Sequence, residues 1–228
     1  AEAAVVATGG QDALGFLPPD MEVAPFVALL GPLKTDTTLI RGLDGVRVRA
    51  EVSLVRDGEV LARECGEVLF RKYGLSGICV FNLSRFAQTG DEVRLNLFPD
   101  MDADMVAALL RARAARAVAP DEGALVESLF TGMLLPSVAA CMCRVADVAK
   151  ETLLADVQPD DFSRLARALT ATPLRVEGIA EPAQCQVHRG GVSPDAVDDA
   201  LESSAHEGLF FAGEALDVDG PCGGYNLH

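Results

Sequence analysis

The side chains with the most reactive chemistry are six cysteines and three histidines, and their spacing disfavours a metal centre. No Cys-x-x-Cys pair occurs and the histidines have no paired spacing, so the usual pattern of zinc ligands is missing from the sequence. Cys141 and Cys143 are two residues apart and would point in different directions on a helix. We therefore expect no metal, and free, mostly buried thiols in a reducing compartment.

The residues that could move a proton do not form a recognisable catalytic group. Ser76 has no histidine or acid next to it in the sequence, so no nucleophile triad is indicated. Tyr73 and Tyr225 are the only tyrosines, and either could serve as an acid. His188 could donate a proton, although a structural residue in a strand is the default interpretation. The catalytic residues are therefore unknown from the sequence.

The acidic composition argues against two classes of partner. The chain has 34 acidic and 19 basic residues, a net charge of −15. Nucleic acids and anionic membranes attract basic surfaces, so we expect neither as a partner. The most apolar stretch, residues 133–143, is shorter than the roughly 20 residues that cross a bilayer. The first residues lack the basic region of a signal peptide, so we expect a cytoplasmic globular protein.

Alternating hydrophobic residues predict several short strands. Residues 46–54 alternate apolar with polar side chains, Asp57-Gly58 supplies a tight turn, and residues 60–70 form the return strand of a hairpin. Further strands are predicted at 93–97, 174–179 and 185–189. Short alternating strands of this kind are typical of a small barrel or sandwich.

Between residues 99 and 172 the hydrophobic spacing becomes helical. Helices are predicted over 103–118 and 124–135, from Pro136 onward, and over 161–169, with no strands in the first two. The arginines at the end of the first helix could form an anion site or a solvated helix face, and the solvated face is favoured; they are Arg111, Arg113 and Arg116.

The two ends of the chain carry unbroken apolar runs that finish in glycine, at residues 3–10 and 208–214. Such runs suit parallel strands buried on both faces. Neither run is followed by the crossover helix that a parallel sheet normally needs. We predict that residues 5–7 and 209–212 pair in parallel as the remnant of a larger α/β domain.

The segment Gly208-Leu-Phe-Phe-Ala-Gly-Glu-Ala-Leu-Asp-Val-Asp-Gly-Pro-Cys-Gly-Gly-Tyr-Asn226 resembles the closing flavin motif of the BaiN-like family of NAD(P)/FAD-dependent oxidoreductases. Three more segments resemble family motifs in the same order: Val5-Val-Ala-Thr-Gly-Gly10, residues 67–85 with their Gly-Leu-Ser-Gly, and Arg189-Gly-Gly-Val192. The resemblance implies a FAD domain interrupted by a long insertion, which comprises a small β-barrel and a helical subdomain on the substrate side of the flavin.

Pattern and resemblance together predict an α+β fold, with a small antiparallel β-barrel, an inserted helical subdomain, and two short parallel strands left from an α/β FAD domain. Residues 1–10 would be a FAD-domain strand fragment. Residues 11–98 and 172–192 would form the barrel, 99–171 the helical subdomain, and 193–228 the return to the FAD domain.

The chain departs from the family pattern at several points, two of which bear on the candidate residues. The Gly-x-Gly-x-x-Gly loop that holds the FAD pyrophosphate occurs nowhere in the 228 residues. Cys79 and His188 stand where the family often has Pro and Thr, so no family function is transferred to either residue.

The resemblance implies cofactor-binding residues at the ends of the two terminal runs. Glu214 would accept hydrogen bonds from the ribityl chain of FAD, because an ionised carboxylate is a strong acceptor. Residues 223–226 would begin a helix whose N–H groups face the pyrimidine edge of the flavin. The full implied set is Gly9, Gly10, Gly213, Glu214, Asp219, Gly223, Gly224, Tyr225 and Asn226.

The function implied by the resemblance is the substrate-side region of a FAD-dependent oxidoreductase that reduces a conjugated or carbonyl small molecule with NAD(P)H. Because the pyrophosphate loop is absent, we expect this chain alone to be inactive and to lack FAD, its partner being the missing FAD-binding domain. Pairing of its exposed strands with a second copy would give a homo-oligomer. The alternatives are a non-enzymatic partner-binding module and a degenerate flavoprotein without cofactor.

Overall fold

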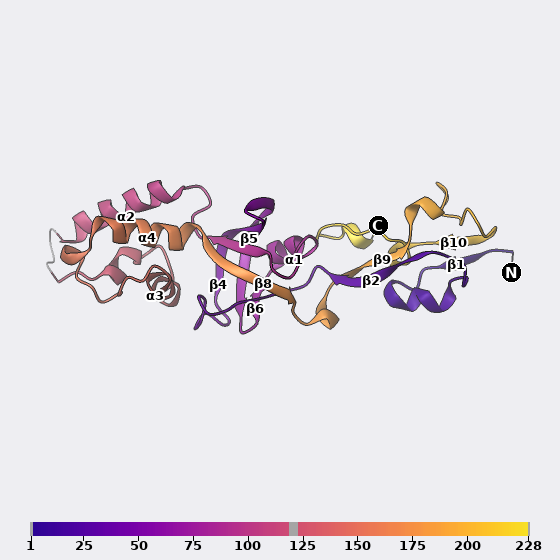
Figure 1. The fold of residues 1–228 in the computed structure, drawn as a ribbon, viewed down its shortest axis with the longest axis horizontal. Helices are drawn as coiled ribbons and strands as arrows, with labels where there is room; N and C mark the ends of the chain where they lie inside the picture. The colour runs from indigo at the N-terminus through magenta and orange to yellow at the C-terminus, as the bar shows by residue number, and fades with distance from the viewer. Residues whose placement is uncertain (1, 119–122, 228) are drawn as a thin grey trace. The chain divides into compact units, whose positions relative to one another are not determined.

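The computed structural model describes residues 2–118 and 123–227, which fold into two compact units. One unit is formed by both ends of the chain, up to Pro32 and from Ile179 onward. The other comprises Leu33–Gly178. Figure 1 shows the elements of each unit. Among the described residues, no helix has the length and apolarity needed to span a membrane.

The middle unit contains the predicted barrel, built from six strands in the order β3-β6-β5-β4-β7-β8. The pairs along this order from β3 to β8 are antiparallel. The backbone N–H of Asp36, which follows β3, donates to the carbonyl of Arg175 on β8 at 2.9 Å. The strands are β3 (Leu33–Thr35), β4 (Arg47–Arg56), β5 (Glu59–Arg71), β6 (Gly74–Ser76), β7 (Glu92–Asn96) and β8 (Thr172–Ile179).

The hairpin predicted from the sequence is β4–β5, with Arg56 opposite Glu59 across the Asp57-Gly58 turn. Both turn residues have positive φ, 51° and 85°, as a two-residue type I′ turn requires. A bulge leaves Leu61 of β5 without a partner, because Leu54 pairs with Ala62 and Val55 with Val60. Leu54 and Val55 are both buried, which departs from the strict alternation expected of β4. The prediction that all the valines face the core is wrong at Val60, which is 41% exposed near the tip of the hairpin.

The predicted helical block lies between β7 and β8, and three of its four helices are confirmed. The side chain of Asp102 accepts the N–H of Met105 at 2.8 Å and caps the first helix. Asp161 caps the last helix by accepting the N–H of Gln158 at 2.8 Å. The α-helices are α2 (Ala103–Val118), α3 (Pro136–Val145) and α4 (Pro159–Thr170), while α1 (Ile78–Ser84) follows β6 and packs on β5.

The helix predicted over 124–135 is wrong. Only a short 3-10 helix, η2 (Val126–Phe130), occurs there. The N–H groups of Val126 and Glu127 donate to the carbonyls of Thr152 and Lys150 rather than to residues four positions back. The helical stretch is short because Leu125 is extended and bridges Leu153, next to the 3-10 helix η3 (Leu154–Asp156), and because Gly132 has a positive φ of 76°.

The unit formed by the chain ends contains two small sheets. The parallel pair predicted from the terminal runs is confirmed, because Ala4, Val5 and Val6 lie opposite Leu209, Phe210 and Phe211. A second, antiparallel sheet pairs β2 with β9. The strands are β1 (Ala4–Val6), β10 (Leu209–Phe211), β2 (Val23–Leu29) and β9 (Val187–Val192).

Strands β2 and β9 pair with each other and not with the six barrel strands. The boundaries of the barrel therefore differ from those expected from the sequence. The compact units thus group 11–32 and 179–192 with the chain ends, whereas the sequence placed 11–98 and 172–192 together as the barrel domain. The functional division into domains stays a prediction. The predicted α+β class with barrel, helices and a parallel pair is confirmed.

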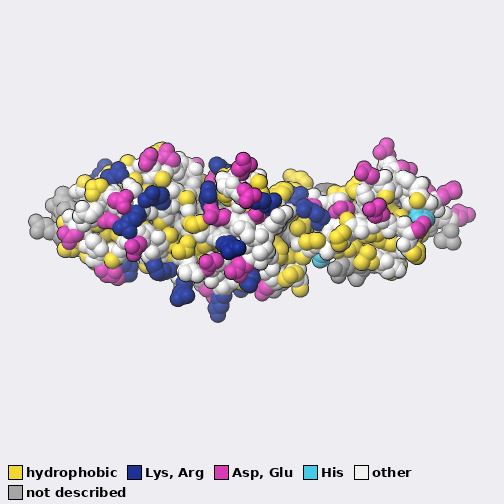
Figure 2. Space-filling view, viewed as in Figure 1, with side chains coloured by type: hydrophobic (Ala, Val, Ile, Leu, Met, Phe, Trp, Pro, Cys, Tyr) yellow, Lys and Arg dark blue, Asp and Glu magenta, His cyan; other side chains and the backbone are white. Residues whose placement is uncertain are grey.

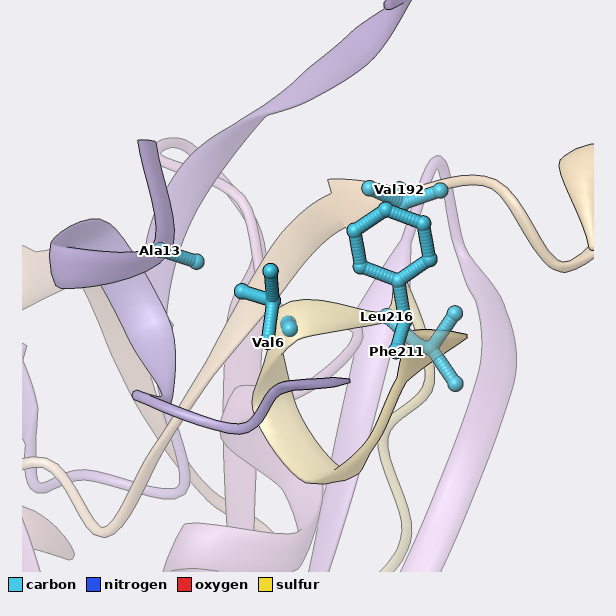
Figure 3. Packing of buried hydrophobic residues seen from close by; sticks show 6 residues of the cluster. Val6, Ala13, Val192, Phe211 and Leu216 are labelled. Atoms are coloured by element: carbon cyan, nitrogen blue, oxygen red, sulfur yellow. The ribbon is translucent and has the colours of Figure 1, made fainter. Parts of the chain in front are cut away.

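A small hydrophobic core holds the terminal unit together (Figure 3). Val6 and Phe211 come from the parallel pair and Val192 from β9, so the core joins the two sheets. Phe211 is only 1% exposed, and its burial contributes roughly 1.5–3 kcal/mol. The short helices of this unit are η1 (Gly10–Phe16), η4 (Pro182–Gln184), η5 (Pro194–Ala196), η6 (Gly213–Ala215) and η7 (Tyr225–Leu227).

Candidate functional site

The candidate site lies at the carboxyl ends of β1 and β10. Gly9 and Gly10 follow β1, and Gly213 and Glu214 follow β10. Because the two strands are parallel, these residues leave the sheet at the same edge, and the N–H of Ala212 donates to the carbonyl of Val6 at 3.0 Å. Ligands of open α/β sheets bind outside the carboxyl ends of the strands.

The side chains of Glu214 and His188 meet beside the backbone of Gly10. The Nδ1 atom of His188 lies 3.8 Å from Oε2 of Glu214, and the two side chains are 36% and 26% exposed. A methyl group placed on Gly10 would lie 3.5 Å from Nδ1 of His188 and 3.7 Å from Oε2 of Glu214. The missing side chain at Gly10 therefore leaves a small cradle whose walls are one carboxylate and one imidazole.

The surface next to this cradle is bare backbone. A Cβ atom added at Gly9, Gly213 or Gly224 would meet no other atom within 4 Å, so open space lies in front of all three. Gly9 and Gly213 also have positive φ, 71° and 62°, which few other residues tolerate. Open glycine backbone beside a carboxylate fits a flat ring that carries a hydroxylated chain, and FAD has both features.

An ion pair holds the C-terminal segment onto β9. Nε of Arg189 donates to Oδ1 of Asp219 at 2.7 Å, and its Nη2 donates to Oδ2 at 3.3 Å. These hydrogen bonds raise the pKa of Arg189 above its ordinary value. In the same segment, Asp217 accepts the backbone N–H of Gly190 at 2.8 Å. The carboxylate of Asp219 is thus engaged by Arg189, which gives it a positioning role in this structure.

The last described residues form a turn closed by Asn226. Its side-chain oxygen accepts the N–H of Gly220 at 2.7 Å, and its amide nitrogen donates to the carbonyl of Gly220 at 2.9 Å. Tyr225 is 66% exposed. The predicted start of a helix appears here as the 3-10 helix η7, which packs against η6.

All nine residues implied by the resemblance lie in one compact unit. Gly9, Gly10, Gly213 and Glu214 meet at the edge, and the other five follow on the segment that returns to it. The sequence did not reveal the partners His188 and Arg189. Both lie on β9, and Arg189 is separated from Asp219 by 30 residues, so no local signal connects them. A role of the nine residues in binding FAD stays a prediction.

Residues 27–187 match the family model described as the HI0933-like protein barrel and H2TH domain, which covers more than half of the chain. The chain belongs to the HI0933-like flavoprotein family. The BaiN-like resemblance is thereby confirmed, and FAD is the cofactor that this family implies.

Several relatives of this HI0933-like chain have names that state an activity. A 3-dehydro-bile acid delta(4,6)-reductase from Clostridium scindens is 31% identical over 212 residues, 90% of this chain and 51% of the relative. A ribosomal RNA dihydrouridine synthase from Escherichia coli K12 is 28% identical over 240 residues, 99% of this chain and 57% of the relative. The synthase of the same name from Haemophilus influenzae is 24% identical over 162 residues, 71% of this chain and 38% of the relative. The chain thus spans about half the length of the first two relatives.

Proposed function

We propose that this chain is the substrate-side region of a FAD-dependent reductase that saturates a carbon–carbon double bond conjugated to a carbonyl. The observation that carries the proposal is the shared edge of β1 and β10, where Glu214 stands beside open glycine backbone. The names of the relatives support the reaction class, because a delta-reductase removes a double bond and dihydrouridine is uridine with one ring double bond saturated.

The residues at the shared edge of β1 and β10 would have different roles in binding the cofactor. Bound FAD would supply the hydride chemistry. The Glu214 carboxylate would accept hydrogen bonds from ribityl hydroxyls, since one of its oxygens faces the cradle at Gly10. The Arg189–Asp219 pair and the Asn226 turn would fix the backbone of 219–226 that approaches the ring.

The reductant in this proposal is NAD(P)H, the substrate is a small conjugated or carbonyl compound, and the protein works in the cytoplasm. The partner is a FAD-binding domain that supplies the pyrophosphate loop, because that loop is absent from the sequence. The chain alone would then bind FAD weakly and be inactive.

A ribosomal RNA substrate, as in the names of two relatives, has less support from this chain. Its net charge is −15, and RNA binding is dominated by basic contacts to phosphate. Figure 2 shows basic and acidic side chains interspersed over the helices and the barrel, and no continuous basic stripe appears on the visible face. A small-molecule substrate suits this surface better than a nucleic acid.

The experiment uses the longest reading frame that contains this chain, purified with FAD. We expect a bound flavin spectrum, and oxidation of NAD(P)H that depends on a conjugated enone steroid and is absent with its saturated analogue. Glu214→Gln should weaken FAD binding by about tenfold, because a neutral amide accepts hydrogen bonds less strongly than a carboxylate. Glu59→Gln on the exposed hairpin is the matched control.

Two outcomes would contradict the proposal. A protein without flavin that still binds a macromolecular partner would support the non-enzymatic module or the degenerate flavoprotein. Flavin-dependent reduction of ribosomal RNA, with no turnover of the enone, would replace the small-molecule substrate with RNA.

A further inference from the structure

A cavity of about 610 Å³ lies within the helical part of the Leu33–Gly178 unit. It is bounded by η2, by the first turns of α3 and by the segment at Lys150. This volume falls within the range of roughly 300–1,000 Å³ that is usual for small-molecule sites. None of the residues assigned to the flavin edge belongs to its lining, so it would be a second, separate site.

The cavity owes its space to short side chains. Ala124, Ala139 and Ala140 line it, and Phe130, which is 1% exposed, contributes an aromatic wall. Leu134 adds a further apolar contact surface. Ser128 and Thr131 also line the cavity, so its surface mixes apolar and polar groups and suits an amphipathic ligand.

Hydrogen bonds hold the walls in place. Nε and Nη2 of Arg113 donate to the carbonyls of Leu129 and Thr131, both at 2.7 Å, and tie η2 to α2. On the other side, the N–H of Glu127 donates to the carbonyl of Lys150 at 3.0 Å. Because these walls are fixed in advance, a ligand would not have to order them on binding.

The polar rim carries an excess of negative charge. Nζ of Lys150 lies 2.9 Å from Oε2 of Glu127 and 3.0 Å from Oε1 of Glu151, so two carboxylates share one ammonium group. An ionised carboxylate offers about four acceptor positions, and Lys150 uses only part of those on Glu127. The rim disfavours an anion and leaves an acceptor for a neutral donor group.

We propose that this cavity binds a neutral, amphipathic small molecule that carries a hydroxyl or N–H group as a donor to Glu127. The apolar walls receive the body of the ligand, and the carboxylate at the rim fixes its polar end. The residues that line the cavity and those of the flavin edge belong to different compact units, so the test does not depend on the proposed reductase activity.

The test titrates this chain with phenylnaphthylamine, a neutral fluorescent amine, and with anilinonaphthalene sulfonate, its anionic relative. We expect saturable binding of the neutral probe, and weaker binding of the anionic one. Ala140→Leu fills the cavity and should lower the affinity for the neutral probe by about tenfold or more. Ala112→Leu, on an exposed position of α2, adds the same side chain outside the cavity and should have no effect.

A second variant tests the rim without adding bulk. Glu127→Gln removes one of the two negative charges, so the preference for the neutral over the anionic probe should shrink. Circular dichroism establishes that each variant is folded. Absence of saturable binding, equal binding by Ala140→Leu and the wild type, or an unchanged preference in Glu127→Gln would overturn the proposal. If the probe bound only at exposed apolar residues such as Phe16, Ala140→Leu and the wild type would bind it equally.

Discussion

Arg189 and Asp219 form a bidentate ion pair between β9 and the segment that carries the C-terminal glycines. The Asp219 side chain is 9% exposed and the Arg189 side chain 42%, so the carboxylate is the buried partner. A second bond, from the N–H of Gly190 to Asp217, lies next to it. The pair therefore fixes this segment on a strand that also carries His188, which lies beside Glu214.

Asp219→Asn should loosen the C-terminal segment without unfolding the protein. The variant leaves Arg189 with a weaker acceptor, and because Arg189 is partly exposed we expect a loss of about 1 kcal/mol in the free energy of unfolding. Hydrogen exchange of the backbone at 213–226 should accelerate. Asp195→Asn, at an exposed position, is the control. Unchanged exchange in Asp219→Asn would show that the ion pair does not hold the segment.

The Arg56–Asp91 pair predicts part of the pH dependence of stability. Asp91 is 4% exposed and accepts hydrogen bonds of 2.8 and 2.9 Å from Arg56, which hold the pKa of this carboxyl below its ordinary value. A lowered folded-state pKa stabilises the protein above the unfolded value of about 3.9. That stabilisation should be lost as the pH falls through this value towards the folded pKa.

The measurement is urea unfolding of the wild type and Asp91→Asn between about pH 7 and pH 2. The wild type should lose stability on acidification more steeply than the variant, and the difference between them should shrink at the acid end. Parallel curves would mean that Asp91 has the same pKa in the folded and unfolded states.

Gly77→Ala should be one of the most damaging small substitutions in the barrel unit. A Cβ at Gly77 would lie 2.3 Å from the carbonyl oxygen of Glu67, and the residue has φ of 117°. Gly42 also has positive φ, 90°, but a Cβ there meets nothing within 4 Å. Gly42→Ala should therefore cost about 1–2 kcal/mol for backbone strain alone. Gly77→Ala should cost clearly more, because the backbone of β5 must move.

Thermal unfolding of the two glycine variants gives the comparison. Equal losses would show that conformational strain, and not the approach to Glu67, explains why glycine is needed at position 77.

The elements that the sequence predicted best are those whose signals are local. The β4–β5 hairpin needs only alternation and the Asp57-Gly58 turn, and α4 needs its helical spacing and its capping residues. The helix expected over 124–135 failed because Leu125 is extended and bridges Leu153, far along the chain, and because Gly132 has a positive φ. Strand β2 was not predicted at all, because Pro25 interrupts its short apolar run and its pairing is irregular between Ala24 and Val27.

In the candidate site, too, some residues could be found from local sequence patterns and others could not. The glycines and Glu214 were found through a motif, and the parallel pairing of the strands before them followed from two apolar runs. The contacts of His188 with Glu214 and of Arg189 with Asp219 depend on how β9 is placed, which no local pattern encodes. For the same reason Asp219 was expected to contact the cofactor and not an arginine.

The cysteines should react with alkylating reagents at very different rates. Cys143 is 2% exposed, and burial raises its pKa to about 11, so little of it is thiolate near neutral pH. Burial also raises the pKa of Cys141. Cys65 is exposed on β5. Timed alkylation at pH 8 followed by peptide mass spectrometry should label Cys65 first, and labelling of Cys143 at the same rate would contradict the buried environment.

Gly10→Ala tests the cradle at the proposed flavin edge. The added methyl would make ordinary contacts, 3.5 Å from Nδ1 of His188 and 3.7 Å from Oε2 of Glu214, so the fold should survive with a cost of about 1–2 kcal/mol for positive φ. The methyl would nevertheless occupy the space between the carboxylate and any incoming hydroxylated chain. Gly15→Ala, where a Cβ meets nothing within 4 Å, is the control. In the longest flavoprotein that contains this chain, Gly10→Ala should weaken FAD binding while Gly15→Ala leaves it unchanged. If both variants bound FAD as tightly as the wild type, the cofactor would have to lie away from Gly10, and the edge of β1 and β10 would lose its assignment.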